Sequence, residues 1–157
     1  MKVPHVLIAL LIAAVIGVSI FGYLASRAIH RESADPAAAL QRFEAARDSI
    51  SALGPLLKLS DEEGVEAVEP PPETQTKHKL SQIKFLAYEV KEEKLTQGAV
   101  PFWFYRLKGP AFSFGLSDSR FDIEKLGLTT DDLERFGPAV IIDETMQSGD
   151  RILVWTE

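Results

Sequence analysis

The fold is decided by residues 82–108, QIKFLAYEVKEEKLTQGAVPFWFYRLK. The first run, Gln82 to Val90, is rich in Ile, Phe, Tyr and Val, which favour strands, and the charged turn KEEK follows it. A second extended run covers Leu95 to Leu107 and is interrupted near Gly98 and Pro101. Two such runs joined by a short turn predict the first two strands of an antiparallel meander.

A third strand and a short helix are expected further along the chain. The turn signal KGPA, residues 108–111, reverses the chain into the run Phe112 to Leu116. In GLTTDDLERFGP an approximate capping box pairs Thr129 with Asp132, and the terminal Gly-Pro stops the helix. The helix is therefore predicted over Thr130 to Phe136.

The sequence predicts a β-hairpin at its C-terminal end. Ala139 to Met146 and Arg151 to Thr156 are β-rich runs joined by the turn residues QSGD. Together with the preceding runs, they predict a domain of the α+β class over residues 80–157. We expect a small, mostly antiparallel sheet of about five strands with one or two short helices.

The N-terminal residues 1–29 are predicted to form a transmembrane anchor. From Val6 to Leu24 the sequence carries no charge, and at about 1.5 Å per residue a helix of this length measures roughly 28 Å, the thickness of a bilayer core. The alternative is a cleaved signal peptide, supported by Lys2 and by the small residues Ser26 and Ala28. The apolar run exceeds the usual signal length of about 7 to 15 residues, which favours the anchor.

The orientation of this single-pass anchor depends on two opposing signals. Lys2 precedes the span whereas Arg27 and Arg31 follow it, so the positive-inside rule slightly favours a cytoplasmic C-terminus. The very short N-terminal tail is typical of a signal-anchor that translocates the domain after it. The absence of cysteine fixes no compartment. We expect the domain that follows the anchor to be extracytoplasmic.

A juxtamembrane helix over residues 35–58 and an acidic, Pro-rich linker over residues 60–79 are expected next. Asp35-Pro36 has the form of a helix start. The helix either packs against its own domain or the bilayer, or binds a partner. The linker sequence SDEEGVEAVEPPPETQTKHK offers little apolar surface to bury, so we expect a solvated tether.

The aromatic stretch PFWFYRLK suggests a core strand or a contact surface. On a strand, Phe102 and Arg106 point to one side, and Trp103 and Tyr105 to the other, so both faces are largely apolar. Such a strand is normally covered on both faces. The alternative is that one face stays exposed for a protein partner or the lipid headgroup layer. These four residues are therefore the candidate contact residues.

Nucleic-acid binding and common enzyme chemistry find little support in the composition. From Leu80 onward, nine Lys and Arg face thirteen Asp and Glu, so no basic field holds a phosphate backbone. His5, His30 and His78 share no metal-ligand spacing, and no cofactor motif is present. The remaining candidates for a hydrolase or metal site are the carboxylates of Asp118, Asp122, Glu124, Asp131, Asp132, Asp143 and Asp150. The alternative is that these side chains cap helices or lie on solvent-exposed faces.

Three motifs resemble those of a loose group of uncharacterised small bacterial proteins with an N-terminal anchor: PFWFYRLK, DLERFGP and the terminal ILVWTE. The resemblance implies a bacterial membrane location and a C-terminal α+β domain, and it assigns no activity or site residue. We therefore expect a membrane-anchored, non-catalytic binding or assembly module of the cell envelope, with a possible protein partner. The alternative is a small envelope hydrolase or metal-binding enzyme that uses carboxylates.

Overall fold

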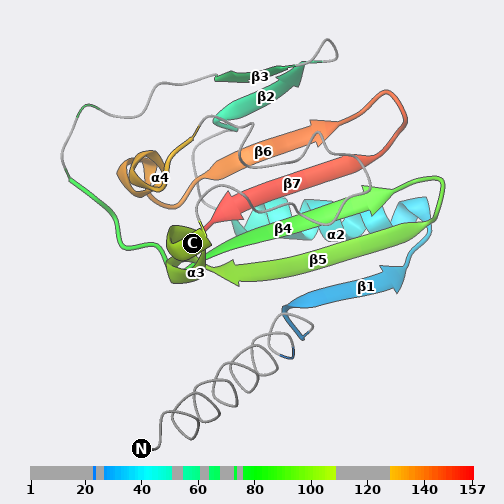
Figure 1. Ribbon diagram of the computed structural model, residues 1–157. Helices are drawn as coiled ribbons and strands as arrows, with labels where there is room; N and C mark the ends of the chain where they lie inside the picture. The colour runs from blue at the N-terminus through cyan, green and yellow to red at the C-terminus, as the bar shows by residue number, and fades with distance from the viewer. Residues whose placement is uncertain are drawn as a thin grey trace, which may run out of the picture.

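A computed structural model of the chain describes residues 23, 27–50, 55–60, 64–67, 73, 76–108 and 128–157. Their strands and helices, shown in Figure 1, are β1 (Ile29–Ser33), α2 (Pro36–Ser49), β2 (Leu57–Ser60), β3 (Gly64–Ala67), β4 (Gln82–Glu89), β5 (Lys94–Pro101), α3 (Phe102–Lys108), α4 (Thr130–Phe136), β6 (Val140–Thr145) and β7 (Arg151–Thr156).

The core of the fold is a five-stranded sheet in the order β1-β5-β4-β7-β6. Every neighbouring pair in it is antiparallel. The central strand β4 pairs with β5 on one side and with β7 on the other, and its apolar residues alternate between two buried faces. The predicted α+β class with an antiparallel sheet is confirmed. The predicted strand Phe112 to Leu116 lies outside the described residues.

Both faces of the sheet are packed. On one face, Ile83 and Phe85 of β4 join a cluster with residues from α3, α4 and β7. On the other face, Leu86 and Tyr88 of β4 join a cluster with Ala39 and Phe43 of α2. Helix α2 lies behind the sheet in Figure 1. Within each cluster the two β4 residues are two positions apart, which is the spacing that puts side chains on the same face of a pleated strand.

Helix α2 is part of this domain. Asp35 caps its first turn, accepting a hydrogen bond from the Ala38 amide at 2.8 Å, and Phe43 is 1% exposed against the sheet. The sequence predicted a helix as far as residue 58. Its C-terminal end is wrong, because α2 ends at Ser49 and residues 57–60 form β2, while residues 51–54 lie outside the described part of the chain. The interpretation that the helix packs against its own domain agrees with the structure.

The acidic segment over residues 60–79 contains a strand that the sequence did not predict. Strand β3 pairs antiparallel with β2 through four residue pairs, so residues 64–67 are not a plain tether. The side-chain composition did not indicate this strand, because the hydrogen bonds that pair two strands join backbone groups. Residues 61–63, 68–72 and 74–75 lie outside the described part of the chain.

The predicted helix and hairpin near the C-terminus are confirmed. The Asp132 amide donates to Oγ1 of Thr129 at 3.1 Å, and the Thr129 amide donates to Oδ2 of Asp132 at 2.9 Å, which completes the capping box of α4. The helix ends at Phe136, and its C-cap residue, Gly137, has a φ of 73° that suits glycine. Strands β6 and β7 then form the terminal hairpin.

The chain enters the sheet through β1, which the sequence did not predict. Ile29 pairs with Gly98, and Ser33 pairs with Lys94, so β1 forms one edge of the sheet. Of the predicted span Val6 to Leu24, only Tyr23 belongs to the described residues. Within the described part of the chain, no helix is long and apolar enough to cross a membrane.

Candidate contact surface on α3

The aromatic stretch is a helix rather than the predicted strand. Strand β5 ends at Pro101, and Phe102 to Lys108 form α3. The Phe102 amide donates to the carbonyl of Ser81 at 2.9 Å, whereas the Ser81 and Gln82 amides bond the carbonyl of Glu157. The pairing of β4 with β5 therefore stops here, and the chain turns across the end of the sheet. Local β-propensity is overridden by tertiary packing.

In α3 the two buried aromatic residues are three positions apart, as on one side of a helix, rather than two apart, as on one face of a strand. Phe102 is 3% exposed and Tyr105 is 1% exposed, and their ring centroids lie 6.0 Å apart. Trp103 between them is 58% exposed. The prediction that Trp103 and Tyr105 share one face is wrong, because residues three apart lie on the same side of a helix. Of the four candidate contact residues, Trp103 and Arg106 are exposed, and the other two belong to the core.

Trp103, Phe104 and Arg106 form what we call the α3 surface. The Trp103 and Phe104 rings meet edge to face, with centroids 6.0 Å apart and an interplanar angle of 78°. Phe104 is partly buried. Arg106 lies above the Phe102 ring, its guanidinium carbon 6.0 Å from the centroid. An exposed tryptophan thus stands beside a second aromatic ring and a cation.

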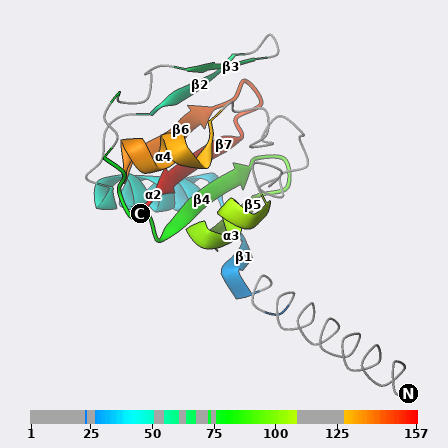
Figure 2. The same ribbon diagram turned by 60° about the vertical axis from the view of Figure 1, so that its left-hand side comes forward.

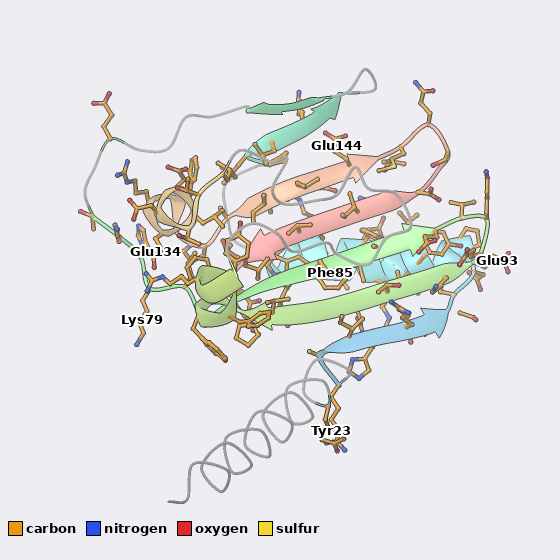
Figure 3. The ribbon with its side chains drawn as sticks, viewed as in Figure 1. Tyr23, Lys79, Phe85, Glu93, Glu134 and Glu144 are labelled. Atoms are coloured by element: carbon orange, nitrogen blue, oxygen red, sulfur yellow. The ribbon has the colours of Figure 1, made fainter. Side chains whose placement is uncertain are left out.

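Helix α3 is held against α4 by an ion pair. The Arg106 guanidinium bonds the carboxylate of Glu134, which is 6% exposed. The backbone carbonyl of Glu134 also accepts a hydrogen bond from the His78 amide at 2.7 Å. Figure 3 places Glu134 at the same end of the sheet as α3. Because a buried carboxylate needs a partner, this pair fixes the orientation of α3 and neutralises Arg106.

Glu134 is a residue of this region that the sequence did not predict. The signal in the sequence is weak, because Glu134 stands between Leu133 and Phe136 in a helix that already carries several acidic residues. Its burial follows from the position of α3, which the strand prediction placed elsewhere. On a strand Phe104 would share the face of Phe102, whereas in α3 its ring packs against Trp103.

The phenol of Tyr105 is the most strongly perturbed group near the α3 surface. Its hydroxyl is buried and has no hydrogen-bond partner among the described residues. Burial raises the pKa of Tyr105 from 10.0 to about 12, because the phenolate loses its hydration. Tyr105 is therefore neutral at physiological pH. Its ring serves the packing between α3 and the sheet.

The α3 surface lies at the end of the sheet where the chain enters from its N-terminal segment. Ile29, the first residue of β1, pairs with Gly98, and β5 continues past this pair to Pro101, directly before α3. A Cβ atom on Gly98 would lie 3.1 Å from the carbonyl oxygen of Ala28, so the two segments touch. Figures 1 and 2 both show α3 close to the start of β1.

The described carboxylates proposed as alternative sites are engaged in structural contacts. Asp131 pairs with Lys77 and with Arg135, and the hydrogen bond from Lys77 lowers its pKa. Asp132 belongs to the capping box. Asp143 lies between Arg47 at 3.5 Å and Arg151 at 3.7 Å.

Asp150 accepts a hydrogen bond from the Val90 amide at 2.9 Å. Within the described ranges, no group of three or more His, Cys, Asp or Glu side chains is placed to hold a metal ion. Asp118, Asp122 and Glu124 lie outside those ranges. The four described carboxylates thus serve as a helix cap, ion-pair partners and a hydrogen-bond acceptor.

Comparison of the chain with protein-family models, curated proteins and solved structures found no match. The resemblance to small anchored bacterial proteins therefore stays a prediction.

Proposed function

We propose that this chain is a membrane-anchored, non-catalytic binding or assembly module of the bacterial cell envelope, and that the α3 surface makes its contact. The observation that carries the proposal is the 58% exposure of Trp103 on a helix whose residues Phe102 and Tyr105 are buried. Exposed tryptophans are enriched at the energetic centres of binding surfaces, because one side chain buries a large apolar area on contact.

The way α3 is held supports this role. Phe102 and Tyr105 fix the helix from inside, and the pair between Arg106 and Glu134 fixes it from the side. Trp103 is therefore presented from a helix that is already ordered. A preorganised contact residue loses less conformational entropy on binding than one on a mobile loop.

The anchor part of the proposal is supported by the sequence. The uncharged run from Val6 to Leu24 is long enough to cross a bilayer. We place the protein at the inner membrane as a single-pass protein, with its α+β domain outside the cytoplasm. Fusing a reporter that is active only outside the cytoplasm after Glu157 tests the orientation. Activity supports this placement, and an active cytoplasmic reporter at the same site contradicts it.

Site-specific photo-crosslinking tests the contact itself. A photoreactive amino acid replaces Trp103 in the full chain, and a matched variant carries it at Leu40, which is 48% exposed on α2. Both variants are irradiated in intact cells, and the membranes are extracted with carbonate. We expect both to stay in the membrane pellet, with a crosslink to a protein or to lipid only from position 103. Equal crosslinking from the two positions contradicts a contact at the α3 surface.

A further inference from the structure

We propose that the contact of the α3 surface is the lipid headgroup layer of the membrane that anchors the chain. This inference rests on the proposed function and names the contact that the function leaves open. It joins three features of the molecule: the short connection to the apolar span, the place of α3 in the sheet, and the different chemistry of the two ends of β5.

The connection between the span and the sheet is short. The apolar run ends at Leu24, and β1 begins at Ile29. Even a fully extended chain covers only about 17 Å over five residues, and a helical one about 8 Å. The end of the sheet that contains Ile29 therefore cannot move far from the membrane surface. Whatever side chains that end exposes are held within reach of the headgroups.

The α3 surface lies at this end. Gly98 pairs with Ile29, and the three further residues of β5 lead directly into α3. At about 3.3 Å per residue this places the start of α3 roughly 13 Å beyond the Ile29 pair along the strand. Because β1 and β5 are antiparallel, this direction is also the one from which the chain arrives before Ile29.

The two ends of β5 expose different kinds of side chain, as expected of a domain that rests on a membrane surface with one end. The α3 end exposes Trp103 beside Phe104, and tryptophan concentrates at membrane interfaces because its ring is apolar and its N–H is polar. The opposite end carries the charged turn KEEK, with Glu93 exposed and far from α3 in Figure 3. One end therefore suits headgroups, and the other suits water.

The residues just before β1 share the interfacial chemistry. The guanidinium carbon of Arg27 lies 4.9 Å above the ring centroid of Tyr23, at the C-terminal edge of the apolar run. Arg106 of the α3 surface is already paired with Glu134. The contact is thus expected to depend on the aromatic rings more than on lipid charge. Neutral phosphatidylcholine should therefore support it.

Tryptophan fluorescence in reconstituted vesicles tests this inference. The full chain contains Trp103 and the buried Trp155, so Trp155→Phe leaves Trp103 as the only reporter. The control adds Trp103→Phe and Leu40→Trp, which moves the reporter to α2. Both proteins are reconstituted in phosphatidylcholine vesicles, with and without phosphatidylglycerol. Quenching by acrylamide in water is compared with quenching by a lipid that carries a nitroxide at its headgroup.

We expect the Trp103 reporter to show a blue-shifted emission, weak quenching by acrylamide and strong quenching by the nitroxide lipid in both vesicle types. The Leu40→Trp reporter should behave in the opposite way. If Trp103 is quenched by acrylamide as readily as the control, the inference is wrong. Shielding of Trp103 from acrylamide without quenching by the nitroxide lipid also overturns it, because a contact between protein surfaces then covers the ring. A chain that carbonate extracts from the vesicles instead contradicts the proposed anchor.

Discussion

Alanine substitutions along α3 should give a pattern of stability losses that only the helix explains. Phe102 and Tyr105 are buried on the inner side of α3, whereas Trp103 between them is mostly exposed. Phe102→Ala and Tyr105→Ala each remove a buried ring and leave a cavity in the cluster that joins α3, α4 and the sheet. Trp103→Ala removes a larger ring but leaves no buried space.

The sizes of the expected effects follow from burial. Truncating a buried aromatic side chain to alanine costs about 3–5 kcal/mol of unfolding free energy, whereas exposed positions usually change it by only about 0.5 kcal/mol. Phe102→Ala and Tyr105→Ala belong to the first class, and Trp103→Ala belongs to the second. With a typical urea dependence, a loss of about 3 kcal/mol lowers the unfolding midpoint by about 1–3 M.

The assay is urea unfolding of the full chain in detergent micelles, followed by circular dichroism. The expected order is a large loss for Phe102→Ala, little change for Trp103→Ala and a large loss for Tyr105→Ala. A strand would give a different pattern, because Trp103 and Tyr105 would share one face. Equal losses for those two variants, with a different value for Phe102→Ala, would refute the helical packing of this stretch.

Three further predictions concern the rest of the domain. Gly98→Ala should lower the unfolding free energy by about 1–3 kcal/mol through overpacking, because the new Cβ would lie 2.6 Å from Phe85. Adding Phe85→Leu should recover part of the melting temperature. If the stability losses of the two substitutions are strictly additive, the contact is contradicted. Asp143→Ala removes the ion-pair partner of two partly buried arginines and should lower the unfolding free energy by about 1–2 kcal/mol in urea titrations. Glu32→Ala should lower it less, because its ion pair is exposed. Burial raises the pKa of Tyr105 from 10.0 to about 12, so the contribution of its neutral phenol to stability is complete below pH 10 and is lost between pH 10 and about 12. In melts at increasing pH, Tyr105→Phe should therefore lose less stability over this range than the unsubstituted protein. An equal loss of stability in the two proteins would contradict the burial of the phenol.

The elements that sequence predicted correctly are those with local signals. Strand β4 alternates apolar residues over a long run, as in Ile83 and Phe85 on one face and Leu86 on the other. Helix α4 has its capping box within four residues, from Thr129 to Asp132. These signals come from residues that are close together in the sequence, so they can be recognised without knowledge of the tertiary structure.

The elements that sequence missed depend on distant partners. Strand β1 has the polar sequence IHRES and is exposed at the sheet edge, so no apolar alternation marks it. The helical conformation of residues 102–108 places Phe102 and Tyr105 in a cluster with residues of α4 and β7, which lie far away in the sequence. The candidate contact residues were therefore found as a group, but their division into Trp103 outside and Tyr105 inside required the structure.

The depth of spin labels in the bilayer tests most directly whether the α3 end of the domain rests on the membrane. The chain has no cysteine, so Trp103→Cys and Glu93→Cys each give a single labelling site in the full protein. These positions flank the two ends of β5, which spans about 23 Å at the usual rise of a strand. In reconstituted vesicles, the label at 103 should be more accessible to oxygen than to a water-soluble nickel complex, and the label at 93 should show the reverse. Two labels with equal aqueous accessibility, or a deeper label at 93, would contradict this orientation.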